Sequence, residues 1–571
     1  MGIRPGWGSR HRVYIAAAAA VVLGAGAAAG ATVASASTSG KTAFAGYHTP
    51  GRVSTTLYRD NTNTPIKHLV VIFGENISFD HYFGTYPFAA NTDGTTFKAK
   101  PGTPAVNGLY TKITKNGPVG PLLTNNSNEF NPQRLTSSEA VTSDQNHGYT
   151  AEENAEDGGK MDMFVQDTES ATPSQGCGPE ACPPGIVMDY FDGNTVTGMW
   201  NYAQNYAMSD NNWDTNFGPS TPGAINVASG DTQDASVLTP AWSSTPDQPA
   251  TSSSVKDGSD QGDVDPFFDT CSDSNHTSTG ALLKMNGENI GDLLNAKHVT
   301  WGWFEGGFAP TSTDSNGAIC GSSHAAIDGV ATADYIPHHE PFQYYASTSN
   351  PDHLPPSSLS DIGFTDQANH QYDTSDFTDA LNGTGGAQLP AVSYVKAPAY
   401  EDAHPGYSDP IDEQRFDVDT INAIEQSKYW SSTAIVITYD DSDGWYDHQA
   451  PKIVNGSDDS SIDAAICSSV AVAVGSGNGR CGYSQRLPMI VISPYTRENY
   501  VSSNQTNTAS VVKFIEDNWL NGERIPNSFD ATSGSLDAPG GLLDFHGRPH
   551  FQPVLLNPTT GAVVSGSKLG H

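Results

Sequence analysis

Basic side chains are scarce in this chain of 571 residues, which has 27 Lys and Arg against 63 Asp and Glu. The formal net charge is −36 at pH 7. A chain so acidic repels polyanions, so the composition argues against nucleic-acid binding and favours a protein kept in solution by self-repulsion. Internal repeats are also absent. Hydrophobic residues make up 36% of the chain and aromatics 9%, which is enough to build a packed core.

Long apolar runs are missing beyond the N-terminus. Residues 1–36 carry Arg4, Arg10 and Arg12, then an Ala/Val/Gly-rich run, and end in Ala34-Ser35-Ala36. A basic segment, an apolar segment and a small-residue cleavage site predict a secretory signal peptide, so we expect an extracellular protein. Its removal would take away three arginines and lower the formal charge from −36 to −39. The alternative is a retained membrane anchor, because the run just reaches the ~18 residues that a span needs.

Cysteine is limited to six positions, and none forms a C-x₂-C pair. An even number of cysteines in an exported chain predicts disulfides, and sequential pairing is our choice among the possible connectivities. It joins Cys177 to Cys182, Cys271 to Cys320 and Cys467 to Cys481. A zinc site is the alternative, which the spacings do not favour.

Several short apolar segments predict buried strands separated by helices, which is typical of an α/β protein with a mostly parallel central sheet covered by helices on both faces. Strands are expected at 68–73, 298–304, 390–396, 433–439 and 487–493, and helices at about 278–295, 412–427 and 508–520. Residues 37–64 are predicted to be a poorly ordered leader. We expect one large domain over 65–571, with long loop insertions near 88–140 and 231–275.

Two of these strands end in oxygen-bearing side chains. Glu75 and Asn76 follow the first strand, and Asp440 and Asp441 follow the strand at 433–439. In open α/β sheets, ligands bind in the crevice beyond the carboxyl ends of the strands. Carboxylate and amide oxygens are hard ligands, so this pattern indicates a divalent cation, with calcium, manganese, iron or zinc left open.

A serine and several histidines complete the candidate site. Ser220 lies in Gly218-Pro219-Ser220-Thr221-Pro222 at a predicted helix start, where a hydroxyl is ordinarily a helix cap but could also be a nucleophile beside a bound anion. The candidate histidines are His147, His338, His339, His404 and His448, which could donate to phosphoryl oxygens or protonate a leaving group. A lone loop histidine is more often only solvated.

Together these motifs resemble the bacterial phosphoesterase family that includes nonspecific phospholipases C and secreted acid phosphatases, within the alkaline-phosphatase-like superfamily. The resemblance covers nearly all of the chain after residue 36. It rests on E-N-x-S-F-D-H-Y-F-G at 75–84, with G-K-M-D at 159–162, G-P-S-T-P at 218–222, H-x-P-F at 339–342, H-P at 404–405, and Y-D-D at 439–441 followed by D-H at 447–448.

The resemblance implies an alkaline-phosphatase-like fold and hydrolysis of phosphoric esters. By position it implies Ser220 as the nucleophile and Glu75, Asn76, Asp440 and Asp441 as metal ligands. It also implies that His147, His338, His339 and His404 surround the phosphate. The expected partner is a small phosphate ester or a phospholipid, with at most peripheral membrane contact, and the oligomeric state stays open.

The sequence departs from the family pattern at two points. Pro222-Gly223-Ala224 stands where relatives often have P-N-R, and the acidic pair is Asp-Asp in place of the common Asp-Glu. A sulfatase-like hydrolase is an alternative, but its modified nucleophile needs an arginine where this chain has Ala224. A catalytically inactive secreted binding protein is the second alternative, and an assay with a chromogenic phosphate ester separates it from an enzyme.

Overall fold

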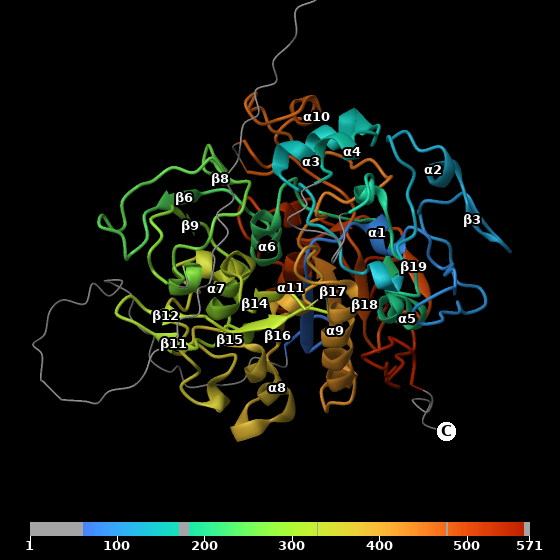
Figure 1. Ribbon diagram of the computed structural model, residues 1–571. Coiled ribbons are helices and arrows are strands. Elements are labelled where there is room, and N and C mark those ends of the chain that lie inside the picture. Colours follow the sequence, from blue (N-terminus) through green and yellow to red (C-terminus); the bar gives the residue numbers. More distant parts are fainter. Residues whose placement is uncertain (1–60, 171–181, 274, 328, 476–477, 565–571) are drawn as a thin grey trace, which may run out of the picture. The chain divides into compact units, whose positions relative to one another are not determined.

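The computed structural model describes residues 61–170, 182–273, 275–327, 329–475 and 478–564 (Figure 1). The predicted signal peptide, residues 37–60 of the predicted leader and Cys177 lie outside these ranges. Within them, no helix combines the length and the apolar character that crossing a membrane requires.

An eight-stranded sheet forms the centre of the fold. Its strand order is β15 (Gln371–Asp373), β10 (Trp301–Glu305), β16 (Val392–Lys396), β1 (His68–Gly74), β17 (Thr433–Tyr439), β18 (Met489–Ile492), β4 (Ala207–Ser209) and β19 (Tyr500–Ser502). Pairing is parallel from β15 through β17, β18 is antiparallel to both of its neighbours, and β19 is parallel to β4. The α/β prediction is therefore confirmed, with a mixed sheet in which β18 runs against the other strands.

Helices cover both faces of this sheet (Figure 1). Residues of α5 (Thr197–Asn205), α8 (Thr374–Asn382) and α9 (Pro410–Glu425) pack in one core with Val70 and Ile72. Residues of α6 (Ser220–Ala228), α7 (Ile290–Ala296) and α11 (Ser510–Trp519) pack in a second core with Leu69, Val71 and Phe73. The continuous apolar run of β1 thus serves both faces, and each fully buried side chain of this kind contributes about 1.5–3 kcal/mol.

Shorter elements lie outside the central layers. The helices are α1 (Phe79–Phe83), α2 (Pro121–Thr124), α3 (Tyr149–Glu156), α4 (Phe164–Asp167) and α10 (Ala465–Ser468). Small two-stranded sheets pair β2 (Lys112–Thr114) with β3 (Gly117–Val119), β5 (Asn212–Trp213) with β20 (Thr506–Asn507), β6 (Ala235–Leu238) with β9 (Leu282–Met285), β7 (Val255–Lys256) with β8 (Ser259–Asp260), β11 (Ser312–Thr313) with β12 (Ala318–Ile319), and β13 (Ser323–Ala325) with β14 (Ala331–Ala333).

The helix predicted at 278–295 is wrong in its first half. Residues 282–285 form β9, and the helix begins only at Ile290. The cause is local: the Asn289 side chain accepts hydrogen bonds from the backbone N–H groups of Gly291 and Asp292, while Asp292 caps Asn289 in return. This capping box fixes the start of α7.

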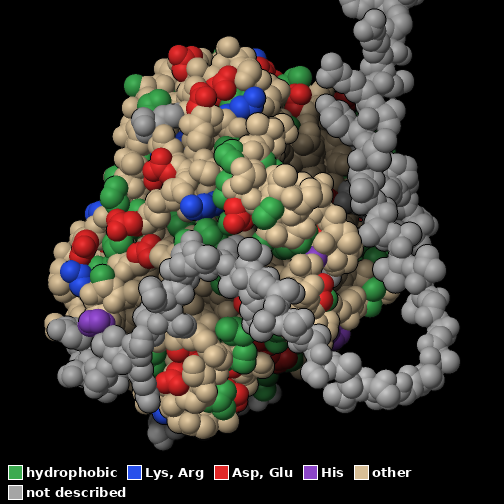
Figure 2. Space-filling view, turned by 90° about the vertical axis from the view of Figure 1, so that its left-hand side faces the viewer, with side chains coloured by type: hydrophobic (Ala, Val, Ile, Leu, Met, Phe, Trp, Pro, Cys, Tyr) green, Lys and Arg blue, Asp and Glu red, His purple; other side chains and the backbone are tan. Residues whose placement is uncertain are grey.

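Two of the three predicted disulfides are confirmed, Cys271–Cys320 and Cys467–Cys481. The third prediction involves Cys177 and so falls outside the described residues. On the face shown in Figure 2, acidic and basic side chains are dispersed among uncharged ones, and Lys and Arg do not gather in one patch.

Candidate active site

The central pair of parallel strands brings the two acidic motifs together. In the register of β1 and β17, Gly74 lies opposite Tyr439, so the residues that follow each strand leave the sheet side by side. A Cβ atom on Gly74 would lie 2.7 Å from the Tyr439 ring, which explains the glycine at this point. The backbone N–H of Asn76 donates to Asp440 Oδ1 at 2.8 Å. Glu75, Asn76, Asp440 and Asp441 are all fully buried.

Helix α6 places Ser220 against these strand ends. Pro219 is the N-cap of α6, and no side-chain cap hydrogen bond is formed there. The Ser220 hydroxyl instead lies 3.2 Å from Asp441 Oδ2 and 3.3 Å from Asn76 Oδ1. A Cβ atom on Gly223 would lie 2.5 Å from the carbonyl oxygen of Asp440, so glycine here lets the helix approach the strand end. The helix-cap interpretation of Ser220 is therefore wrong for this structure.

Most of the oxygens around Asn76 Oδ1 belong to carboxylates, and the Ser220 hydroxyl is the one donor among them. Asn76 Oδ1 lies 2.7 Å from Glu75 Oε2, 3.2 and 3.1 Å from the two carboxylate oxygens of Asp440 and 3.3 Å from Ser220 Oγ. Turning the amide over would place its nitrogen there as a donor, whereas a divalent cation would hold the oxygen inward as a ligand. The chemistry of this donor set fits a hard divalent cation.

The pKa shifts of two of the carboxyl groups also favour a bound cation. Burial, followed by the charge of Asp440, raises the pKa of Glu75 well above its usual range. Burial and Asp440 likewise raise the pKa of Asp441, although His147 opposes the shift. These groups retain protons unless positive charge compensates them, and a bound cation would supply that charge.

His147 lies immediately before α3, beside Asn76 and an acidic pair. Its Nε2 is 3.4 Å from Asn76 Nδ2, and its Nδ1 is 3.1 Å from Asp443 Oδ1. Burial lowers the pKa of His147, but Asp441 and Asp443 outweigh burial and raise it well above the usual value. The imidazole is therefore protonated at neutral pH and presents N–H groups.

The remaining candidate histidines continue from His147 in an arc. Ring centroids are 6.2 Å apart for His147 and His404, 6.5 Å for His404 and His339, and 4.6 Å for His339 and His338. Burial lowers the pKa of both His339 and His404. Burial also lowers the pKa of His338, but its hydrogen bond to Asp265 reverses the shift and raises it. The pKa is therefore raised for the two rings at the ends of the arc, His147 and His338, and lowered for the two rings between them.

The structure brings together all nine predicted site residues and separates His448 from them. His448 donates its backbone N–H to Asp80 Oδ2 at 2.8 Å and lies 2.6 Å from the same oxygen through Nδ1. Arg486 joins this network, with Nη2 at 3.4 Å from Asp80 Oδ1 and 3.0 Å from Asp447 Oδ2. His448 is thus part of an ion-pair cluster with Asp80 and Arg486, apart from the other candidate histidines.

Sequence reasoning missed two residues beside the site. Lys396 is the last residue of β16, and its Nζ lies 2.5 Å from Glu75 Oε1. Asp402 Oδ2 lies 3.7 Å from His339 Nδ1. The available signal was a lysine at the end of an apolar strand, because a lysine is rarely buried unless an opposite charge lies beside it.

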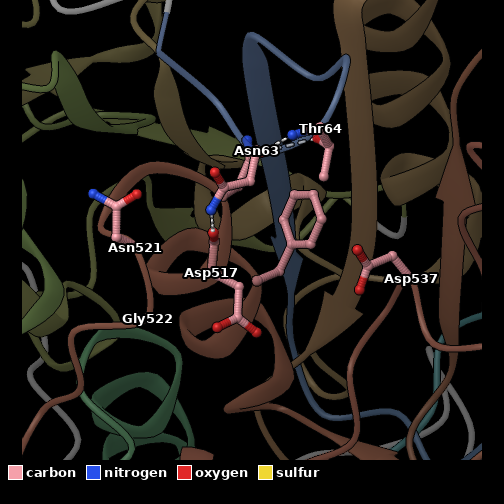
Figure 3. A pocket seen from close by; sticks show the side chains of 8 residues that line it. Asn63, Thr64, Asp517, Asn521, Gly522 and Asp537 are labelled. Atoms are coloured by element: carbon pink, nitrogen blue, oxygen red, sulfur yellow. Dashed lines mark hydrogen bonds between the residues drawn. The ribbon is translucent and has the colours of Figure 1, made fainter.

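Several groups of described side chains are compact enough to hold a metal ion. Two border the site: Glu75 with His339 and Asp402, and Asp144 with His147 and His404. A pocket of about 360 Å³ lies elsewhere, and it is lined by Asn63, Thr64, Phe514, Asp517, Asn518, Asn521, Gly522 and Asp537 (Figure 3). It shares no residue with the nine site residues.

Comparison with known proteins gives one family. The model of the phosphoesterase family matches residues 66–520. A non-hemolytic phospholipase C of Pseudomonas aeruginosa is 31% identical over 22% of this chain and 20% of its own length. Phospholipase C B of Mycobacterium tuberculosis is 24% identical over 83% of this chain and 77% of its own length. The chain thus spans only about a fifth of the first of these relatives.

Among solved structures, a protein of the alkaline phosphatase superfamily from Vibrio parahaemolyticus aligns with 57% of this chain and 60% of its own, at 10% identity. The TM-score of this overlap is 0.25.

Proposed function

Because this chain belongs to the phosphoesterase family, we propose that it is a metal-dependent hydrolase of phosphoric esters with Ser220 as its nucleophile. The observation that carries the proposal is the position of the Ser220 hydroxyl. It lies 3.2 Å from Asp441 Oδ2 and 3.3 Å from Asn76 Oδ1, among carboxylates at the ends of two neighbouring strands. A hydroxyl there is placed to lose its proton and attack phosphorus.

Glu75, Asn76, Asp440 and Asp441 would hold the cation. When bound, a divalent cation would lower the pKa of the Ser220 hydroxyl and neutralise charge on the phosphoryl oxygens. The fully buried position of the four residues supports this assignment, since acidic groups so far from water require positive charge beside them.

The histidines would then supply hydrogen bonds to the phosphoryl group and carry out the proton transfers. His147 Nε2 and Asn76 Nδ2 lie 3.4 Å apart, and both are donors when His147 is protonated. Two donors cannot bond to each other, so both are available to a phosphoryl oxygen. His338, whose pKa is raised, suits protonation of the leaving group. The rings of His339 and His404, whose pKa values are lowered, can accept a proton from the water that hydrolyses the phosphoserine intermediate and regenerates the Ser220 hydroxyl.

The substrate is proposed to be a phosphate ester or a phospholipid. The names of the relatives, phospholipases C, favour a phospholipid headgroup bond, with water at the membrane surface as the acceptor. A phosphomonoester is the other member of the class, because the chemistry at phosphorus is the same and only the group beyond the phosphate differs.

We also propose that residues 1–36 direct export. The disulfides Cys271–Cys320 and Cys467–Cys481 support an oxidising compartment. N-terminal sequencing of protein recovered from culture medium tests this, with Ser37 as the expected first residue and Met1 as the outcome that contradicts cleavage.

The decisive experiment is a substrate panel on the wild type and Ser220→Ala, before and after chelation. The panel contains p-nitrophenyl phosphate, bis(p-nitrophenyl) phosphate, phosphatidylcholine vesicles and p-nitrophenyl sulfate. We expect phosphate ester hydrolysis that chelation and Ser220→Ala both abolish. Hydrolysis of the sulfate alone would favour a sulfatase, and no turnover on any substrate would favour a binding protein.

A further inference from the structure

Lys396 is a buried cation at the edge of the proposed metal site. It is the last residue of β16, which is the strand next to β1, and its side chain is fully buried. Its Nζ lies 2.5 Å from Glu75 Oε1 and 3.8 Å from Asp402 Oδ2. Removing an ammonium from water costs several kcal/mol unless opposite charges surround it, so this position requires the acidic groups beside it.

The groups around the ammonium would themselves make a cation site. Glu75, His339 and Asp402 each offer a ligand atom, and these atoms lie within 4.8 Å of one another. His339 Nδ1 is 3.4 Å from Glu75 Oε1 and 3.7 Å from Asp402 Oδ2. Carboxylate and imidazole groups both serve as protein ligands for zinc and similar divalent ions.

These ligand atoms are not satisfied by hydrogen bonds. Glu75 Oε1, Asp402 Oδ2 and Lys396 Nζ are buried and have no hydrogen-bond partner of acceptable geometry. Charge alone therefore holds the three together. The Lys396 ammonium therefore acts on these carboxylates as a point charge, as a metal cation bound among them would.

Glu75 connects the two positions. Its Oε2 lies 2.7 Å from Asn76 Oδ1 on the side of Ser220, and its Oε1 faces Lys396. One carboxylate between two positively charged positions is the arrangement of a two-cation centre. Here one of the two positions contains an ammonium group that is part of the chain.

We propose that Lys396 takes the place of a second divalent cation and so limits the site to one metal ion. The proposal rests on the proposed function, because it assumes that Glu75, Asn76, Asp440 and Asp441 bind the first ion. It assigns Lys396 as a positioning residue that keeps Glu75 charged and turned toward Asn76.

The test counts Mn²⁺ ions bound per chain by elemental analysis after equilibrium dialysis. The wild type should bind one. Lys396→Ala removes both the charge and the stem and should bind two. Lys396→Met keeps a stem of similar volume without charge, so it should bind no more than one, with an affinity lower than that of the wild type.

A double variant identifies the second position. Lys396→Ala with Asp402→Asn should return the count to one, because the new ion loses a carboxylate ligand. If Lys396→Ala does not fold without metal, millimolar Mn²⁺ should restore its folding by replacing the lost charge. A chain that stays unfolded in Mn²⁺ overturns the proposal.

The remaining outcomes are equally decisive. Two ions in the wild type, or one ion in folded Lys396→Ala, would overturn the role of Lys396 while leaving the metal-dependent hydrolase intact. No bound ion in the wild type would remove the metal from the proposed function itself, and the role of Lys396 would be overturned with it.

Discussion

The Ser220 hydroxyl lies 3.2 Å from Asp441 Oδ2, so a side chain in the first turn of α6 meets a carboxylate just beyond β17. The two residues are 221 positions apart in the chain. Only the packing of α6 against the carboxyl end of the sheet brings them together, and Gly223 permits that packing because any Cβ would strike the Asp440 carbonyl.

Replacing Ser220 by alanine should abolish turnover without unfolding the protein. The Ser220 side chain makes no helix-cap bond, so even the ~1 kcal/mol typical of capping is not at stake. Loss of a covalent step should lower kcat by about 10³-fold or more. Steady-state kinetics and thermal unfolding of the same preparation measure both quantities.

Thr221→Val is the matched control for this variant. The Thr221 hydroxyl is buried and lies 3.3 Å from the Tyr344 hydroxyl. We expect a modest loss of stability and turnover within a few-fold of the wild type. A Ser220→Ala protein as active as Thr221→Val would remove Ser220 from the mechanism.

Removing the metal should destabilise the fold as well as stop the reaction. Four buried carboxyl and amide groups lose their shared positive partner, and Glu75 and Asp441, whose pKa values are raised, must take up protons. Adding a divalent cation back at about 100 times its Kd should stabilise the folded protein by about 2.7 kcal/mol. Calorimetric unfolding of chelated and reconstituted protein provides the measurement.

Asp441→Asn and Asp80→Asn separate the metal site from an ordinary buried ion pair. Asp80 lies beside His448 and Arg486, so its neutralisation should cost stability, about 3–5 kcal/mol, without changing the metal content. Asp441→Asn should lower metal affinity. Equal metal content in the two variants would count against the proposed ligand set.

The sequence predicted the strand ends well because each motif is continuous along the chain. Glu75 and Asn76 directly follow an apolar run, as Asp440 and Asp441 do, and no knowledge of strand order is needed to place them beyond the sheet. Lys396 was missed because its partner Glu75 belongs to a different strand. That β16 lies beside β1 is a fact of topology, and no local pattern records it.

The same limit applies to His448. His448 follows an acidic strand end and so resembled a site residue, but its ring is held by Asp80, which comes 368 residues earlier. Conversely, the helix expected at 278–295 failed on a local competition, since Asn289 caps a later helix start. Patterns of apolar residues predicted the helices and strands, whereas the role of a single side chain depended on contacts with residues far away in the sequence.

Stability should fall as the pH rises from 6.5 to 9. Burial raises the pKa of Asp417 to about 8 and that of Glu425 to about 7, far above the ordinary carboxyl range of ~4. The folded state therefore holds protons that the unfolded chain has released, so stability present at low pH is lost as the pH rises through these values.

Asp417→Asn isolates one contribution to this pH dependence. The variant keeps the shape of the side chain and cannot ionise, so its loss of stability between pH 6.5 and 9 should be smaller than that of the wild type by on the order of 2 kcal/mol. Denaturant unfolding at both pH values measures the difference. An unchanged pH dependence would show that Asp417 is already ionised in the folded protein.

The two disulfides should differ in what they contribute to stability. Cys271–Cys320 closes a separation of 49 residues and Cys467–Cys481 one of 14. In the chain-entropy model, the first restricts the unfolded chain by about 4 kcal/mol and the second by about 3 kcal/mol. Paired Cys→Ser variants of each bridge should therefore both lower the free energy of unfolding, the 271/320 pair by about 1 kcal/mol more.

Neither bridge includes one of the nine site residues, so turnover at a temperature where both variants are folded should stay near the wild-type rate. The reverse ranking in denaturant unfolding would mean that contacts in the folded state, and not the length of the closed loop, set the contribution of these bridges.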